Sequence, residues 1–316
     1  MRTTSAETHP ERLRRISFSP YLLLSLAPLF WAGNWIIGRG LHTAVPPMSM
    51  TLYRWLFAIV FMLPFALPHL RRDWREVRAN WRILIVLGLL GIGSHNALAF
   101  LGLNYTTATN GVILNSFIPV MIIAISWIFL HQRLSGLQIV GVIVSLLGVL
   151  AILSQGSIER LLAFRLNIGD LFVVGSITIW ATYTVCLRWR PPNLHPLTFL
   201  FVIACVGVVQ MLPLYIGEVA LGKLTHWSWQ VVLAFAGMGL FSSFMAYVFW
   251  TQGVTAVGAS VAGLFLHLMP VYGTLLAWLF LDERPEAFHF VGIAMILSGI
   301  YITSRRASVP VPAAPE

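Results

Sequence analysis

Met62-Leu63-Pro64 recurs 149 residues later as Met211-Leu212-Pro213, and Trp31-Ala32 recurs at the same interval as Trp180-Ala181. Further along the chain the interval becomes 151 residues, and it relates the following pairs: Pro119 and Pro270, Arg133 and Arg284, Gly141 and Gly292, Gly148 and Gly299. The same landmarks therefore appear in the same order in two strongly apolar halves. Such an internal duplication is typical of membrane transporters.

The composition independently indicates a membrane protein. Hydrophobic residues make up 58% of the chain and charged residues 10%, whereas soluble domains have roughly 45–50% and about 25%. Most of the apolar stretches have about the 20 residues that a helix needs to cross a bilayer core of roughly 30 Å. Because lipid cannot satisfy backbone groups, we expect an all-α polytopic fold. The ten predicted spans are 19–38, 47–68, 82–103, 108–130, 135–154, 168–188, 195–217, 229–251, 256–281 and 286–304.

The spans divide the chain into two five-helix repeats, 19–154 and 168–304, joined by a linker at 155–167. The remaining segments, 1–18 and 305–316, are predicted tails. The segment 69–82 is predicted as a connection between two spans, because it is rich in arginine. Since five is an odd number, the second repeat begins on the opposite side of the membrane, and we expect ten helices in a 5+5 inverted repeat around a central cavity.

The arginines predict the orientation. If the N-terminus is cytoplasmic, fourteen arginines fall in inside segments and five Lys or Arg residues fall outside. The positive-inside rule then places both termini in the cytoplasm. The net charge of +9 is a topology signal, and short loops offer no folded basic face for nucleic acid. Short connections favour the inner membrane of a bacterium.

Two related motifs carry a family resemblance. Ala108-Thr109-Asn110-Gly111 leads to Pro119 and to Leu130-His131-Gln132-Arg133, and Gly258-Ala259-Ser260-Val261-Ala262 leads to Pro270 and to Leu281-Asp282-Glu283-Arg284. Both halves resemble the ten-helix EamA branch of the drug/metabolite transporter superfamily, in which a glutamate follows the proline by thirteen residues. The first half departs from this pattern, since Gln132 stands at the glutamate position.

The resemblance implies that helices 1–4 and 6–9 surround a central cavity, with helices 5 and 10 at the periphery. Members of the superfamily export amino acids and their analogues or small drugs, or carry nucleotide-linked sugars and phosphorylated metabolites. Polar residues inside the spans must discriminate among these substrates, because such residues are costly in lipid and tend to face a cavity or a partner.

The first helix carries Trp31, Asn34 and Trp35 on one face, and the sixth carries Trp180 and Tyr183 on the matching face. Two aromatic surfaces with hydrogen-bonding groups would suit a planar or apolar solute. Ordinary helix packing and an interfacial aromatic belt are the alternative explanation.

The embedded cation Arg54 could bind a carboxylate or phosphate in bidentate fashion, or could serve only as a structural partner. His95 and His267 could titrate or donate to a substrate, and either could simply join two helices. Three amide side chains, again with packing as the alternative, complete the predicted substrate site: Asn96, Asn115 and Gln252.

Four prolines are predicted to kink the spans or to act as hinges and gates: Pro64, Pro119, Pro213 and Pro270. No carboxylate falls in the middle of a predicted span, so a carboxylate proton relay is not expected. Phosphate-binding, nucleophile-elbow, zinc-protease and CxxC motifs are missing from the sequence, and we therefore predict no catalytic residue, metal or cofactor.

The leading hypothesis is an exporter of small organic solutes, favouring amino acids with an aromatic or apolar bias, that works by alternating access. A carrier of phosphorylated or nucleotide-linked metabolites ranks second, because it would need several embedded cations. A membrane-embedded enzyme or scramblase ranks third. The expected partners are the small-molecule substrate and the lipid bilayer. The sequence leaves the exact substrate, the direction of flux, the coupling ion, the most stable conformational state and the oligomeric state open, with a monomer among the options.

Overall fold

The computed structural model describes residues 18–41, 43–103, 105–162, 167–281 and 284–304, and every regular element in them is a helix. Ten helical segments are long and apolar enough to cross a membrane, which confirms the all-α polytopic fold. The predicted tails, apart from Phe18, lie outside the described residues, as do Asp282 and Glu283 of the second motif.

The first half of the chain forms five spans. Their helices are α1 (Pro20–Leu41), α2 (Pro47–Ala79), the composite of α3 (Trp81–Gly88), η1 (Leu89–Ser94) and α4 (His95–Leu103), the pair α5 (Ala108–Asn115) and α6 (Ile118–Leu130), and α7 (Gly136–Leu153). A short helix, α8 (Ile158–Leu162), follows in the predicted linker.

The second half repeats this order. Its helices are α9 (Ile168–Cys186) with η2 (Leu187–Trp189), α10 (Pro196–Ala220), the composite of α11 (Trp229–Gly237), η3 (Met238–Met245) and α12 (Ala246–Val257), the composite of α13 (Ala259–Leu264), η4 (Phe265–His267) and α14 (Leu268–Leu281), and α15 (Ala287–Ser304).

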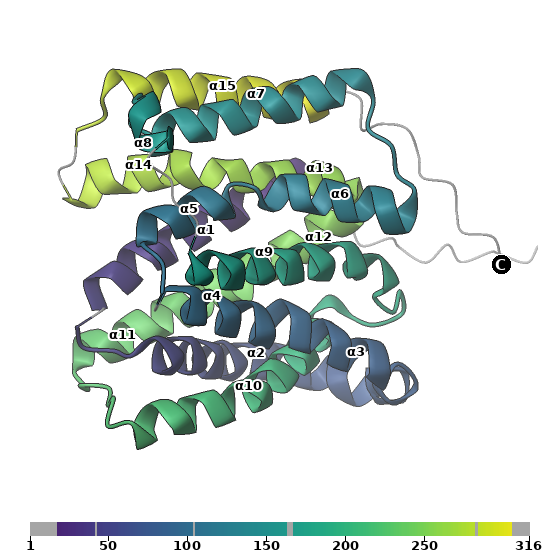
Figure 1. The fold of residues 1–316 in the computed structure, drawn as a ribbon. Coiled ribbons are helices and arrows are strands. Elements are labelled where there is room, and N and C mark those ends of the chain that lie inside the picture. Colours follow the sequence, from purple (N-terminus) through teal and green to yellow (C-terminus); the bar gives the residue numbers. More distant parts are fainter. Residues whose placement is uncertain (1–17, 42, 104, 163–166, 282–283, 305–316) are drawn as a thin grey trace, which may run out of the picture.

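Helices from opposite halves pack in reciprocal pairs. α1 lies against α12 and α14 of the second half, and its counterpart α9 lies against α4 and α6 of the first. In the same way η3 packs on α2, and η1 packs on α10. Two further pairs join equivalent helices, α2 with α10 and α7 with α15, at opposite sides of the bundle (Figure 1). This exchange of partners is what a two-fold relation between the repeats produces.

The pair α7 and α15 forms one side of the molecule, as the resemblance implies for helices 5 and 10 (Figure 1). Glycines make their close approach possible. A Cβ on Gly148 would lie 2.7 Å from the carbonyl oxygen of Gly292, and one on Gly292 would lie 2.7 Å from the carbonyl oxygen of Gly148. The repeated spacing of the two halves thus places small residues opposite one another, and the helix backbones come into contact.

α2 is longer than the sequence predicts. The helix continues to Ala79, through the arginine-rich segment expected to be a connection. Arginine, leucine and glutamate are good helix formers, and no glycine or proline interrupts the segment after Pro68. At about 1.5 Å per residue, the 33 residues of α2 span about 50 Å, so its last turns extend beyond the hydrocarbon core.

Irregular backbone occurs at equivalent places in the two repeats. η1 and η3 are π-helical segments in the middle of the third and eighth spans. The fourth span is interrupted after Asn115, just before Pro119, and the ninth passes through the 3₁₀ turn η4, just before Pro270. Pro64 and Pro213, in contrast, lie inside the continuous helices α2 and α10. π-segments often occur at functional sites.

Buried carboxylates lie at helix ends. Glu218, near the end of α10, accepts hydrogen bonds from the backbone N–H groups of Met48 and Ser49 in the first turn of α2, at 3.1 and 2.8 Å. Asp170 accepts from the N–H group of Asn167 at the start of α9 and from the hydroxyl of Thr106. Helix N-termini favour such negative groups.

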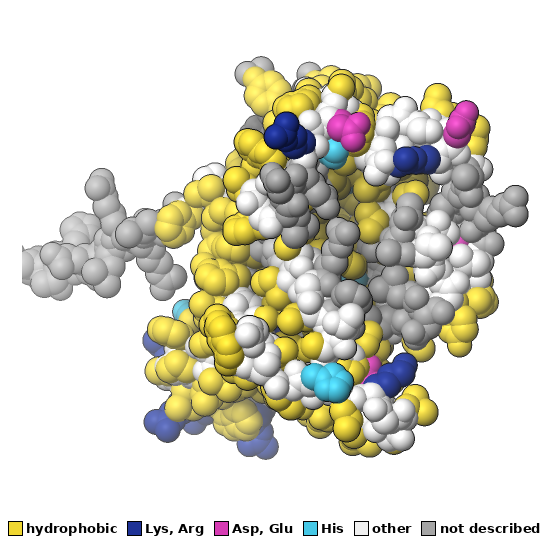
Figure 2. Space-filling model, turned by 90° about the vertical axis from the view of Figure 1, so that its left-hand side faces the viewer, with side chains coloured by type: hydrophobic (Ala, Val, Ile, Leu, Met, Phe, Trp, Pro, Cys, Tyr) yellow, Lys and Arg dark blue, Asp and Glu magenta, His cyan; other side chains and the backbone are white. Residues whose placement is uncertain are grey.

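Figure 2 looks onto the left-hand end of Figure 1 and shows hydrophobic side chains over most of the described surface and few charged ones.

Candidate functional site: a polar and aromatic centre

A polar network joins three spans of the first repeat to one of the second. Arg54 of α2 is 8% exposed, and it donates from Nη1 to Oδ1 of Asn34 at 3.3 Å and from Nη2 to Oδ1 of Asn96 at 3.1 Å. Ser242 of η3 donates its hydroxyl to the same Asn34 oxygen at 3.1 Å. Both acceptors of the guanidinium are therefore neutral amides, and its charge has no carboxylate partner among the described residues.

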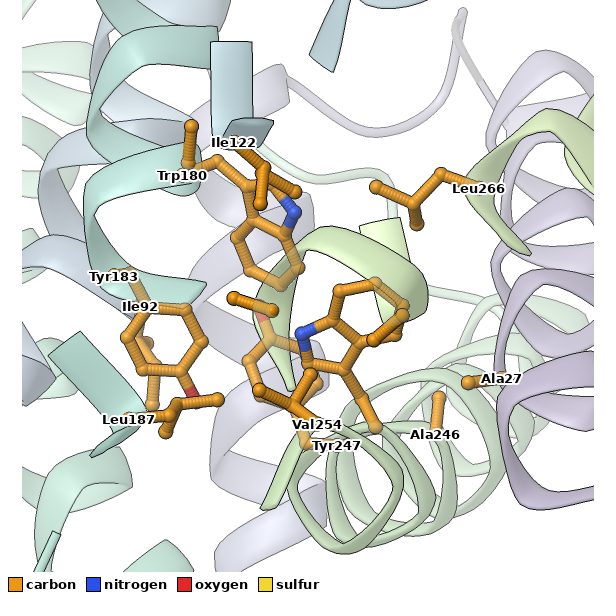
Figure 3. Close-up of a cluster of buried hydrophobic side chains, with 14 of the residues drawn as sticks. Ala27, Ile92, Ile122, Trp180, Tyr183, Leu187, Ala246, Tyr247, Val254 and Leu266 are labelled. Carbon is orange, nitrogen blue, oxygen red and sulfur yellow. The ribbon is translucent and has the colours of Figure 1, made fainter. Parts of the chain in front are cut away.

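Aromatic rings from α1, α9 and α12 fill the centre of the bundle beside this network. The ring of Trp31 lies edge-on to the rings of Trp180 and Tyr247, with centroids 5.5 and 5.8 Å apart, and 5.5 Å from the ring of Trp250. Figure 3 shows Trp180, Tyr183 and Tyr247 in the same central region. The predicted meeting of the aromatic faces of helices 1 and 6 thus takes place, with α12 as a third contributor.

Carbonyl groups of the two π-segments orient these side chains. Tyr247, in the second repeat, donates its hydroxyl to the carbonyl oxygen of Gly91 in η1 at 3.0 Å. Trp31, in the first repeat, donates its indole N–H to the carbonyl oxygen of Ser242 in η3 at 3.0 Å. Asn96 donates to the carbonyl oxygen of Ile92 in η1 at 2.7 Å. Since a π-segment interrupts the regular helical hydrogen bonding, its carbonyl groups can serve as acceptors for side chains of the opposite repeat.

His95 and Tyr183 border the aromatic cluster. Nδ1 of His95 lies 2.8 Å from the hydroxyl oxygen of Ser176, and the imidazole ring lies 5.1 Å from that of Trp180. The ring of Tyr183 packs directly on Gly91, where any Cβ would collide with it. Tyr183 therefore depends on a glycine in the π-segment of the other repeat for its position.

Among the described residues, three buried N–H groups of the centre have no acceptor, and the buried hydroxyl of Tyr183 also lacks a partner. The three N–H groups are Nε of Arg54 and the indole N–H groups of Trp55 and Trp250. The ring of Trp55 lies 4.8 Å from Tyr247, so this residue belongs to the same cluster. Buried polar groups are nearly always paired, and each unpaired one costs about 1–3 kcal/mol. A ligand rich in acceptor atoms would satisfy all three.

His267 lies elsewhere, in the 3₁₀ turn η4 of the ninth span, facing the break in the fourth span. It is 1% exposed; Nδ1 lies 2.7 Å from the hydroxyl oxygen of Ser145, and Nε2 lies 3.1 Å from the carbonyl oxygen of Ser116. Both ring nitrogens thus have protein partners in this conformation. The carbonyl of Ser116 is free to accept because the fourth span is interrupted there. The role of His267 as a substrate ligand stays a prediction, and the observed geometry favours a structural role.

In the described part of the chain, three other predicted residues form no hydrogen bond or ring contact with the central network. Trp35 is 52% exposed, Gln252 is exposed, and Asn115 donates to the carbonyl oxygen of Gly111 within its own helix. The structure brings together Trp31, Asn34, Arg54, His95, Asn96, Trp180 and Tyr183.

Sequence reasoning did not select four residues of the centre: Trp55, Ser242, Tyr247 and Trp250. They lie in apolar runs where an aromatic residue or a serine is unremarkable. One signal was present, since Trp55 directly follows Arg54. The π-segments themselves leave no pattern in the sequence that hydrophobic periodicity would detect.

Comparison with known proteins agrees with this architecture. The model of the EamA-like transporter family matches residues 18–154 and again residues 167–305. The chain belongs to the EamA-like transporter family. It is therefore an integral membrane protein of a family of small-solute transporters, and the two matches cover both halves of its internal repeat.

Known proteins match this chain along almost their whole length. The uncharacterized transporter YyaM of Bacillus subtilis is 27% identical over 293 residues, covering 92% of this chain and 95% of YyaM. The protein PecM of Dickeya dadantii is 26% identical over 285 residues, covering 87% and 89%. A solved crystal structure with 19% identity superposes with a TM-score of 0.73, covering 92% of this chain and 98% of the other, which supports the fold alone.

Proposed function

We propose that this EamA-like transporter exports small organic solutes, above all amino acids with an aromatic or apolar side chain, by alternating access through the centre described above. The observation that carries the proposal is that Arg54 is a buried cation and that both of its hydrogen-bond acceptors are neutral amides. We place the transporter in the inner membrane of a bacterium, with both termini in the cytoplasm.

Arg54 has no counter-charge among the described residues. An unpaired charge in the interior of a membrane protein costs several kcal/mol, and such residues mark substrate or ion pathways. Asn34 and Asn96 hold the guanidinium in place without neutralising it. A substrate carboxylate would supply the negative charge, and its oxygens could accept from the unpaired Nε atom.

The aromatic cluster supports an apolar or aromatic side chain on the substrate. Trp31 and Trp180 come from the equivalent helices of the two repeats and meet at 5.5 Å, so a ligand between the halves would contact both indoles. Edge-to-face aromatic contacts are worth about 0.5–1.5 kcal/mol beyond the burial of area. A ring on the substrate could replace the contacts that these side chains now make with each other.

A phosphorylated metabolite is the second candidate, because it too offers an anion to Arg54. It is less well matched, since Arg54 is the one arginine or lysine of the central network among the residues that the structure describes, and a phosphate dianion favours several cations.

Counterflow in proteoliposomes tests the proposal. We expect saturable uptake of labelled tryptophan and phenylalanine, with weaker uptake of threonine and none of a sugar phosphate. Uptake should be lost in Trp31→Ala and in Arg54→Gln, while Trp278→Ala, an exposed tryptophan of α14, serves as a matched control. Repeating the assay with an imposed pH gradient measures proton coupling. Uptake of the sugar phosphate alone, lost in Arg54→Gln, would establish the second candidate instead.

A further inference from the structure

The C-terminal extension of α2, which the proposed orientation places on the cytoplasmic side, has two different faces. On one side Asp73 accepts hydrogen bonds from the backbone N–H of His195 at 3.1 Å and from the hydroxyl of Thr198 at 2.9 Å, at the start of α10. Glu76 on the same side accepts from Asn80 at 2.8 Å and from Asn193 at 3.2 Å. Both acidic residues of this segment are therefore engaged with polar groups of the protein.

The other side of the extension is basic and aromatic. Arg71, Arg75 and Arg78 are spaced by three or four residues, which aligns them along one helix face, and all three are exposed. Trp74 lies on the same face and is 52% exposed. We call this surface, completed by Arg72 and by the exposed Trp81 and Arg82 at the start of α3, the basic face.

No carboxylate in the described part of the chain neutralises the basic face. Among the described residues none of its five arginines forms an ion pair, because the two acidic residues of the segment are engaged on the opposite side of the helix. The guanidinium of Arg82 lies over the ring of Trp81, 5.5 Å from its centroid, and this contact leaves its positive charge in place. The charges of the basic face are thus available to an external anion.

The position of the basic face along α2 indicates which kind of anion would bind there. A bilayer core of roughly 30 Å takes up about 20 residues of the helix, so Arg71 and the residues after it follow directly at the headgroup level. Tryptophan is typical of this zone, where one edge of the indole meets apolar chains and the other meets water. Anionic headgroups in the cytoplasmic leaflet attract juxtamembrane Lys and Arg residues by about 1 kcal/mol for each residue.

We propose that the basic face binds anionic phospholipid of the cytoplasmic leaflet, with the arginines on the headgroup phosphates and Trp74 and Trp81 at the border of the acyl chains. Since the face is the outer side of the segment that joins the second and third spans, bound lipid would hold this hairpin at the membrane surface. This inference does not depend on the substrate of the central site.

Native mass spectrometry of the full chain in a neutral detergent tests the inference. The wild-type protein should retain phosphatidylglycerol at concentrations where phosphatidylcholine with the same acyl chains is not retained. Substituting Arg71→Gln, Arg75→Gln and Arg78→Gln together should weaken the apparent affinity about 100-fold, a factor of roughly five for each charge. The corresponding triple lysine variant should retain most of the binding, because it keeps the charge.

The control removes two arginines at the opposite end of the molecule, by Arg160→Gln and Arg284→Gln, both of them exposed, and should leave binding unchanged. The unfolding transition of each variant, measured in phosphatidylcholine, shows whether the variant is folded when no anionic lipid is present. Equal retention of the two lipids by the wild type, or unchanged phosphatidylglycerol binding in the triple glutamine variant, would overturn the inference. Displacement of the lipid by millimolar inorganic phosphate would also overturn it, since it would indicate a site for free anions.

Discussion

The substitution Asn34→Asp puts the proposed role of Arg54 to a quantitative test, because it supplies an internal counter-charge. The Oδ1 atom of Asn34 lies 3.3 Å from Nη1 of Arg54, so a carboxylate there would form an ion pair with little change of shape. Coulomb's law at this distance, with an effective dielectric constant of about 20, gives a gross attraction of about 5 kcal/mol. Desolvation of the new carboxylate offsets a large part of this energy.

If about half of that attraction remains, the substrate carboxylate loses about 2–3 kcal/mol of its interaction with Arg54. The affinity for tryptophan should then fall roughly 30-fold to 150-fold. The variant Asn34→Ala is the matched control, since it removes one neutral acceptor without adding charge. It should weaken binding only about five-fold, in line with the loss of about one hydrogen bond.

The assay is equilibrium binding of labelled tryptophan to purified protein, with tryptamine, which lacks the carboxylate, as a competitor. Tryptamine should compete equally well against the wild type and against Asn34→Asp, or better against the variant. Equal tryptophan affinity in wild type and Asn34→Asp, with both proteins folded, would refute the assignment of Arg54 as the partner of the substrate anion.

Three further predictions concern the contacts that hold the two repeats together, and each is measured as the free energy of unfolding in mixed detergent micelles. Tyr247→Phe leaves the carbonyl of Gly91 without its donor and should destabilise the protein by about 1–3 kcal/mol; an unchanged value would mean that water replaces the hydroxyl. Ser145→Ala leaves Nδ1 of His267 unpaired in a buried site and should cost about 1–3 kcal/mol, whereas Ser298→Ala, on an exposed turn of α15, should cost far less. Gly148→Ala forces α7 and α15 apart and should cost about 1–3 kcal/mol, while Gly217→Ala, where a Cβ meets nothing within 4 Å, should be neutral or stabilising.

The two π-segments provide a physical route for communication between the repeats. Trp31 binds a carbonyl of η3 and Tyr247 binds a carbonyl of η1, so each repeat orients an aromatic residue of the other. A substrate that displaces either side chain would release a π-segment carbonyl. Because π-segments and the breaks before Pro119 and Pro270 are the irregular parts of otherwise continuous spans, we expect motion between the repeats to concentrate there.

Sequence reasoning could select residues whose polar or charged side chains stand out in apolar spans. Arg54, Asn34 and Asn96 are polar groups in apolar spans, and they do meet in one network. His267 has the same character, yet its ring is enclosed by Ser145 and Ser116. Periodicity shows that a residue lies within a span but does not say which helix packs against it, so a buried structural histidine and a ligand-binding one look alike in sequence.

The sequence by itself determined the membrane class, the number of spans and the duplication, because these depend on composition, on the length of apolar runs and on landmarks that repeat along the chain. Only the tertiary structure decided which side chains share the centre. The bonds from Trp31 to Ser242 and from Tyr247 to Gly91 join residues 211 and 156 positions apart, and they depend on backbone carbonyls exposed by π-segments. Such pairings arise from the way the two repeats pack against each other, and that packing is not a property of any local stretch of sequence.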